Sequence, residues 1–135
     1  MTFEEESKSD LIKHKLEKAN GSVNDVRFLI DNDKLVIAVN RIYYGIFYAL
    51  SALALKYQFA TSKHQQLIGW FNNNFVKEKK VDRKYGEILH RAFDKRSKGD
   101  YDDFVEFSKD EVEQLFQDMK DFINKIKDMI VSEAT

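Results

Sequence analysis

The chain has 135 residues, of which 43% are hydrophobic and 33% charged, a composition typical of one globular domain with a core of its own. It contains no cysteine, which excludes disulfides, thiol catalysis and thiolate metal sites, and the lack of proline suits long helices. The net charge of −1 argues against a general polyanion-binding protein.

The chain begins with an acidic, polar segment, residues 1–8, which we expect to be flexible and not to be a signal peptide. The first predicted helix runs from about Ser9 to Ile30, because apolar residues recur there at three- and four-residue steps. Gly21 lies inside this helix and costs about 1 kcal/mol of helix propensity, so we expect a local weakness without a break. Asp31-Asn32-Asp33 predicts a turn, with Asp33 able to cap the next helix.

The second predicted helix, from about Lys34 to Tyr57, is apolar on nearly every side. Such a helix is surrounded by other helices, or by other helices and a second subunit, so we expect a homodimer. The apolar stretch from Ile42 to Leu55 is shorter than the roughly 20 residues that span a bilayer. We therefore expect a cytoplasmic protein that makes no membrane contact.

Two shorter helices follow. Thr61-Ser62 with Gln65 resembles a capping box and predicts the start of a short third helix. A charged stretch then leads to a fourth predicted helix that ends near Ser97, where Lys98-Gly99-Asp100 predicts a loop.

The last helix has the clearest pattern. Ser108 with Glu111 predicts its N-terminal cap, and apolar residues between Val112 and Ile130 form one stripe at helical spacing. No segment has the two-residue period of a strand. We therefore predict an all-α fold, a single domain over residues 1–135 that forms an antiparallel bundle of about five helices, three long and two short.

Charge is unevenly distributed along the second half of the chain. Residues 77–98 carry nine Lys/Arg and four acidic residues, whereas residues 100–118 carry eight acidic residues and one lysine. This pattern fits a basic face for phosphate or RNA beside an acidic face for a basic partner. It also fits two solvated helix faces within one bundle.

A polar pair, Asn40-Arg41, begins the long apolar run of the second helix. A buried arginine needs a partner, and we predict an ion pair between Arg41 and Asp100. A guanidinium fixed in this way can hold a phosphate or carboxylate bidentately, although a purely structural ion pair would use the same residues. Arg96, Asp100 and Tyr101 come at the end of a predicted helix, where functional side chains concentrate.

The aromatic residues that follow Arg41 could stack on nucleobases, but aromatics at helical spacing favour a place in the core. These residues are Tyr43, Tyr44, Phe47 and Tyr48. His64 lies at a predicted helix start, where backbone N–H groups favour anions, and an exposed helix start is the alternative. No histidine has a second ligand at metal-binding spacing, so we expect neither a metal nor a cofactor.

Three pieces of the sequence are together similar to a HEPN domain (higher eukaryotes and prokaryotes nucleotide-binding), and in particular to the small stand-alone HEPN proteins of bacteria and archaea. The pieces are Asn40-Arg41-x-Tyr43-Tyr44, Ser62-Lys63-His64 with Phe71 and Phe75-Val76-Lys77, and Arg96-x-x-x-Asp100-Tyr101. The resemblance implies a helical bundle that commonly forms a homodimer. It also implies a frequent partner, a minimal nucleotidyltransferase, with the HEPN protein as the toxin of a toxin–antitoxin pair.

Many HEPN proteins are metal-independent ribonucleases with an Arg-x4-6-His motif, in which the arginine steadies the phosphate and the histidine moves protons. Arg96 matches that arginine, but residues 101–103 are Tyr101, Asp102 and Asp103, and no histidine follows His90. The resemblance thus makes Arg96 and Tyr101 the candidate catalytic residues.

The candidate binding residues are Asn40, Arg41, Tyr44, His64 and Asp100. Our first hypothesis is a HEPN protein with a degenerate motif that binds RNA, a nucleotide or its nucleotidyltransferase partner, and does not bind DNA. The alternative is an active ribonuclease toxin with a displaced base, which could be His64 if the fold brings it near Arg96.

Overall fold

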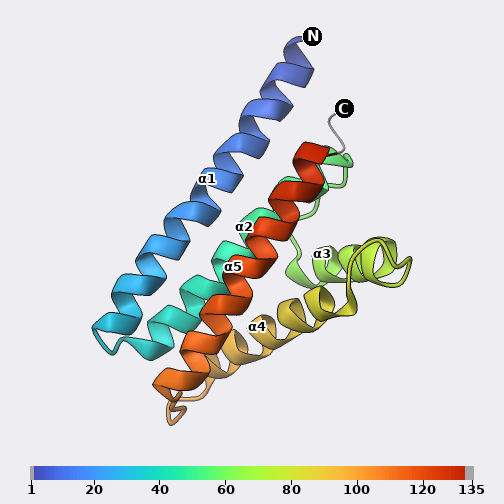
Figure 1. Ribbon diagram of the computed structural model, residues 1–135. Helices are drawn as coiled ribbons and strands as arrows, with labels where there is room; N and C mark the ends of the chain where they lie inside the picture. The colour runs from blue at the N-terminus through green and yellow to red at the C-terminus, as the bar shows by residue number, and fades with distance from the viewer. Residues whose placement is uncertain (1, 133–135) are drawn as a thin grey trace.

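The computed structural model describes residues 2–132, and the described part of the chain contains helices but no strand (Figure 1). The elements are α1 (Phe3–Asp31), α2 (Leu35–Lys56), α3 (His64–Phe71), the π-helical turn η1 (Asn72–Val76), α4 (Arg83–Tyr101) and α5 (Lys109–Ser132). The prediction of an all-α bundle of about five helices is confirmed.

Helix α2 is the central element of the bundle. It contacts α1, α5, α4 and α3, and Figure 1 shows α1, α2 and α5 running alongside one another while α4 crosses them. Within residues 2–132, α2 is the one helix long and apolar enough to cross a membrane by length and composition. Its burial by four neighbouring helices accounts for this apolar character, as in the core helix of a bundle. The homodimer prediction therefore no longer draws support from α2.

Helices α1 and α2 begin differently from the prediction. Helix α1 starts at Phe3, so residues 3–8 of the segment expected to be flexible are helical, and Thr2 and Glu5 form a capping box there. The helix continues through Gly21 without a break, as predicted. Asp33 does not cap α2: it adopts a left-handed turn conformation with φ of 57°, and Lys34 is the N-cap residue, without a side-chain bond.

The predicted capping box of the third helix is also wrong. Helix α3 begins at His64 after the N-cap residue Lys63, which makes no side-chain cap bond. The Thr61 hydroxyl accepts a hydrogen bond from the Lys63 amide at 3.1 Å and donates one to Gln66. Thr61 therefore stabilises the loop before the helix and leaves the helix end itself uncapped.

The fourth helix is longer than predicted, because Lys98-Gly99-Asp100 continues it as far as Tyr101. Gly99 lies close to the side chains of Val36 and Phe107, so this glycine serves close packing within a helix. The long fifth helix is capped as predicted: the Glu111 amide donates to Ser108 Oγ and the Ser108 amide donates to the Glu111 carboxylate, both at 3.1 Å.

Among the glycines, Gly45 of α2 is the most closely packed. A Cβ atom at this position would overlap the Met119 side chain of α5 and would lie 3.0 Å from Ser22 Cβ of α1. The absence of a side chain thus lets three helices meet at one point.

The opposite charges of the second half of the chain meet across α4 and α5. Arg91 pairs with Asp118 at 3.2 Å and Lys95 pairs with Glu111 at 2.6 Å. For these residues, the opposite charges belong to neighbouring helix faces of one bundle, and they are paired with each other and not only solvated.

An aromatic layer joins α3 to the end of α2 and the loop that follows it. Trp70, the single tryptophan of the chain, stacks on Phe59 with ring centroids 5.2 Å apart and planes at 8°. Tyr57 and Phe75 contact the same indole ring. This layer anchors α3 beside α2 and fixes the position of His64 at the start of α3.

Candidate functional site

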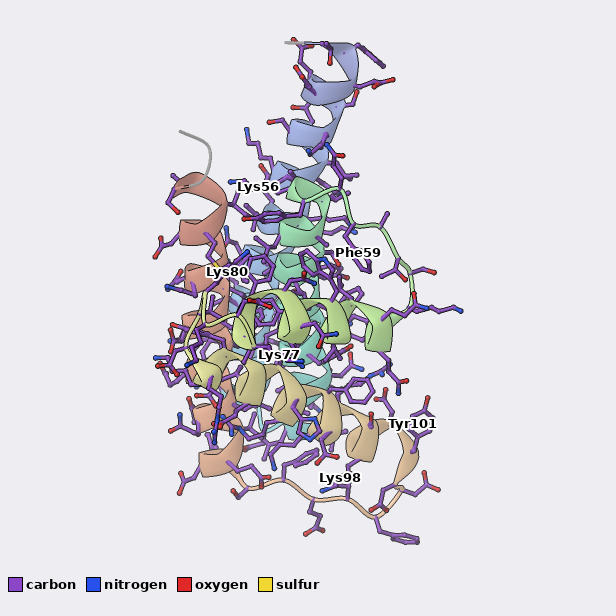
Figure 2. All side chains as sticks on the ribbon, turned by 90° about the vertical axis from the view of Figure 1, so that its right-hand side faces the viewer. Lys56, Phe59, Lys77, Lys80, Lys98 and Tyr101 are labelled. Carbon is purple, nitrogen blue, oxygen red and sulfur yellow. The ribbon has the colours of Figure 1, made fainter. Side chains whose placement is uncertain are left out.

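Seven side chains from three helices form a polar and aromatic cluster, which we call the arginine site. Asn40, Arg41, Tyr43 and Tyr44 lie on one turn of α2, His64 begins α3, and Arg96 and Asp100 lie one turn apart on α4. Figure 2 views the molecule from the side on which α3 and α4 lie next to each other in front of α2. Residues that are far apart in the sequence therefore meet where these three helices pack.

Arg96 is the centre of the arginine site. Its side chain is only 18% exposed, and its guanidinium lies over the rings of Tyr43 and Tyr44, with distances of 5.2 and 5.4 Å to the centroids. Nη2 donates a hydrogen bond to the Tyr44 hydroxyl at 3.0 Å. A half-buried guanidinium held between aromatic rings is desolvated and oriented, which strengthens its electrostatic interactions.

The ion pair of Arg96 leaves part of its hydrogen-bonding capacity unused. Nε lies 2.9 Å from Asp100 Oδ2, close enough for an ion pair but without hydrogen-bond geometry. Within residues 2–132, this Nε is the one buried side-chain nitrogen or oxygen atom that lacks a hydrogen-bond partner. Because buried polar groups are usually satisfied, an unsatisfied arginine donor marks Arg96 as a functional candidate.

The predicted pairing of Arg41 with Asp100 is wrong. Because α4 extends to Tyr101, Asp100 lies one helical turn after Arg96 and pairs with it, and its other oxygen accepts a 3.4 Å hydrogen bond from Asn40. Arg41 donates from Nε and Nη2 to Asn40 Oδ1 at 3.2 and 3.1 Å, and its guanidinium lies 5.0 Å from the Tyr44 centroid. Asn40 thus bridges the arginine and the aspartate that we expected to meet.

His64 is brought to the same two tyrosines as Arg96. Its Nδ1 lies 2.7 Å from the Tyr43 hydroxyl, its ring stacks on Phe47 at 3.9 Å, and it meets Tyr44 edge-on at 6.0 Å. The fold therefore meets the condition under which His64 could replace the motif histidine.

The surroundings keep His64 and Tyr43 neutral. Burial, and then the positive charge of Arg96, lower the pKa of His64 below its usual 6.5, so the imidazole is uncharged at neutral pH. Burial raises the pKa of Tyr43 far above its usual value of 10.0, so its hydroxyl keeps its proton. A neutral imidazole can accept a proton, and two arginines with one aspartate leave the site a net charge of about +1.

Tyr101 is not brought into the arginine site. It is the last residue of α4, is 82% exposed and lies at the outer end of the helix in Figure 2. Since the Tyr101 side chain is exposed and has no hydrogen bond or ring contact within residues 2–132, its candidate catalytic role finds no support in this geometry.

The sequence left Tyr43 and Phe47 as possible nucleobase-stacking residues, with a place in the core favoured. Tyr43 is fully buried, as expected, but its hydroxyl also orients His64, and Phe47 supplies the surface on which the imidazole stacks. The spacing Asn40-Arg41-x-Tyr43-Tyr44 indicated that the turn matters. The contact with His64 could not be read from it, because it depends on where α3 packs.

Within residues 2–132, no group of three or more histidine, cysteine or acidic side chains could hold a metal ion. The chemistry available to the arginine site is therefore that of two guanidinium groups, a neutral imidazole and tyrosine hydroxyls. Such a set can bind an oxyanion and move a proton beside it.

Comparison with known proteins agrees with the all-helical fold. The HEPN domain family matches residues 12–129, and the chain belongs to this family. A UPF0332 protein of Thermotoga maritima is 36% identical over 91% of this chain and 93% of its own length. A protein of Methanocaldococcus jannaschii named "putative toxin" is 32% identical over 87% of this chain and 80% of its own length. A second protein of that organism with the same designation is 30% identical over 83% of each chain.

Proposed function

We propose that this protein binds the phosphate groups of RNA or of a nucleotide at the arginine site. The observation that carries the proposal is the position of Arg96: its guanidinium is largely buried, lies over the Tyr43 and Tyr44 rings and donates to the Tyr44 hydroxyl, while its Nε is already paired with Asp100. Guanidinium groups match phosphate oxygens in geometry and charge. The net positive charge of the site and the names of the relatives support the same proposal.

Arg41 would provide the second positive charge. Its only hydrogen-bond partner among the described side chains is the neutral amide of Asn40, so no carboxylate neutralises it. Arg41 and Arg96 lie over the same Tyr44 ring, which keeps two like charges close together. An anion bound beside this ring would relieve their mutual repulsion.

The test is the affinity for a fluorescent, 12-nucleotide single-stranded RNA, measured by anisotropy for the native protein, Arg96→Ala and Arg27→Ala. A hydrogen bond to a charged group is worth about 1.5–3 kcal/mol, so Arg96→Ala should weaken binding by about 10- to 150-fold. Arg27 is the control, because it is a partly exposed arginine on α1 that pairs with Asp31 and Glu113. Equal affinities for the native protein and Arg96→Ala would reject the proposal.

The position of His64 supports a second candidate function, the cleavage of RNA. With its proton on Nδ1 donated to the Tyr43 oxygen, the imidazole would have a free Nε2 lone pair to accept the proton of a ribose 2′-hydroxyl. The 2′-oxygen would then attack the neighbouring phosphorus and form a 2′,3′-cyclic phosphate, and the departing 5′-oxygen would take up a proton from the imidazolium or from water, while Arg96 stabilises the negative charge that develops on the phosphate.

The cleavage candidate is tested with total RNA in the presence of EDTA, comparing the native protein with Arg96→Ala and His64→Gln. General-base transfer contributes a factor of about 10²–10⁴, so His64→Gln should lower the rate by that factor. RNA that stays intact with the native protein would leave binding as the function of the site. Cleavage that survives His64→Gln would exclude this histidine as the base.

We further propose that the protein forms a homodimer and that its partner is a minimal nucleotidyltransferase that acts as antitoxin. The HEPN family and the toxin designation of two relatives support both proposals. Light scattering that gives the monomer mass across a wide concentration range would contradict the dimer. The partner is tested by co-expression with the product of a neighbouring nucleotidyltransferase gene, and the absence of a complex would contradict it.

A further inference from the structure

The turn between η1 and α4 has an open hollow lined mainly by cations. Lys77, Lys79, Lys80 and Arg83 line it from the turn and Lys125 lines it from α5, with Asp82 as the one carboxylate in the lining. We call these five cations the basic turn. Even when Glu78 is counted with Asp82, five positive charges face two negative ones.

Four of the five cations of the basic turn have no ion pair with a described residue. Lys77, Lys79 and Lys80 form none with any residue between 2 and 132, and Lys125 meets only the Tyr85 ring at 6.0 Å, whereas Arg83 forms an exposed pair with Glu87 at 3.1 Å. By contrast, Arg91 and Lys95 farther along α4 are neutralised by α5. The excess positive charge seen in the sequence between residues 77 and 98 is therefore concentrated at one end of α4.

The backbone holds the basic turn in one conformation. Lys79 has a left-handed φ of 59°, and the amides of Lys77 and Lys80 donate to Asn72 and Phe75 carbonyls at 2.8 Å each. Val81 anchors the turn in the core with 7% exposure. The lysine side chains thus project from a fixed frame, which lowers the entropy lost when a ligand binds.

A second hollow connects the basic turn to the face of α4 that borders η1. Gly86 and His90 line it opposite Asn72, and it shares Val76 and Arg83 with the hollow of the basic turn. Figure 2 shows Lys77 and Lys80 near the start of α4 and Tyr101 at its other end. Arg96 lies 13 residues after Arg83 on α4, which is about 20 Å along the helix axis at about 1.5 Å per residue.

We propose that the basic turn is a second phosphate-contacting surface for single-stranded RNA that also occupies the arginine site. This inference rests on the proposed function, since it takes RNA as the ligand of Arg96. At about 3.4 Å per nucleotide of a stacked strand, roughly six nucleotides would cover the distance between the two sites. A single strand fits better than a duplex, because Arg96 is recessed between two tyrosine rings.

The experiment measures the affinity for a 12-nucleotide RNA carrying 2′-O-methyl groups, which cannot be cleaved by 2′-hydroxyl attack, between 50 and 200 mM salt. The turn variant is Lys77→Gln/Lys79→Gln/Lys80→Gln. The control variant, Lys13→Gln/Lys18→Gln/Lys34→Gln, removes the same charge from exposed lysines elsewhere. Each phosphate contact contributes about 0.7 to the slope of log K against log salt, so the turn variant should lower the slope by about 2 and the control should not.

Two further ligands make the outcomes distinguishable. A dinucleotide, too short to reach both sites, should bind the native protein and the turn variant equally. Polyglutamate of matched charge should compete poorly with the RNA, whereas equal competition would mean a general polyanion surface and overturn the RNA assignment.

The outcomes separate the two proposals. If the turn and control variants lose RNA affinity equally, the basic turn has no special role. The same holds if the turn variant keeps its RNA affinity while Arg96→Ala loses it, and in both cases the arginine site remains supported. Loss of affinity in the turn variant with none in Arg96→Ala would overturn the proposed function and make the turn a separate RNA surface. A native protein that does not bind the 12-nucleotide RNA would overturn both.

Discussion

The two faces of α2 bury side chains of opposite character. Toward α1 and α5, Gly45 and its neighbours form a contact of small and apolar groups, with Met119 and Ser22 pressed against the backbone. Toward α3 and α4, Tyr43 and Tyr44 carry a polar cluster that includes a buried donor without a hydrogen bond. One helix thus supplies close packing on one side and a polar site on the other. Variants on the first side should change mainly the stability of the fold, and variants on the second should change mainly ligand binding.

The largest effect is expected on the packed face. In Gly45→Leu, the new side chain would overlap Met119 and crowd Ser22, and overpacking of this kind costs about 1–3 kcal/mol, here at the upper end. Urea denaturation measures the change. Gly21→Ala is the control, because a Cβ there meets nothing within 4 Å and should stabilise α1 by about 0.5–1 kcal/mol. If Gly45→Leu unfolds at the same urea concentration as the native protein, the packed face tolerates more than its geometry indicates.

The next variant should lower stability while it raises affinity for phosphate, which distinguishes the two faces of α2 more sharply. Asp100→Ala removes the negative charge beside Arg96, which should lower the free energy of unfolding by about 1–3 kcal/mol while raising the affinity for phosphate. Asp94→Ala is the control on the same helix, since its pair with Lys98 is more than half exposed and contributes about 0–1 kcal/mol. Parallel losses of stability and affinity in Asp100→Ala would show that the aspartate is needed for binding itself.

A smaller effect is expected for Tyr43→Phe. The hydroxyl bonds only to His64 within the described chain, so its removal should cost about 0.5–1.5 kcal/mol of stability and leave RNA affinity unchanged. Thermal denaturation and anisotropy measure the two quantities. Tyr48→Phe, which removes a hydroxyl that forms no hydrogen bond within residues 2–132, serves as the reference and should change neither. A marked loss of RNA affinity in Tyr43→Phe would place the hydroxyl in the binding site.

The smallest effect concerns pH. Since the pKa of His64 is lowered in the folded state, the unfolded chain binds more protons between that pKa and 6.5, and stability should fall as the pH decreases through this window. His64→Gln should lose less stability than the native protein between pH 7 and pH 5. Other groups titrate equally in both proteins, so the difference isolates His64. Identical pH profiles would mean that its surroundings do not favour the neutral form.

The parts of the fold that depend on local sequence could be predicted. The Ser108–Glu111 cap and the apolar stripe of α5 are examples, because a capping box and a helical period are encoded within a few residues. The loop predicted at Gly99 is instead part of α4, because packing near Phe107 and Val36 outweighs the low helix propensity of glycine. Asp33 failed as a cap because the turn needs it in a left-handed conformation.

For the arginine site, the sequence predicts which residues come together but not how they pair. Asn40, Arg41, Tyr44, His64, Arg96 and Asp100 do gather, but their pairing follows from two non-local facts: the helix continues to Tyr101, and α3 packs with His64 toward Tyr43. Neither fact is encoded by spacing along the chain. The same limit explains why Tyr101, adjacent to Asp100 in sequence, lies outside the cluster.

The stack of Trp70 on Phe59 has a consequence for how the bundle can be observed. Trp70 is the single tryptophan and lies in the layer formed by α3, so its intrinsic fluorescence reports on the side of α2 that carries the arginine site. Circular dichroism, in contrast, averages over all the helices. Coincident transitions by the two signals would mean that both faces of α2 melt as one cooperative unit, whereas an earlier change in emission would mean that α3 detaches first.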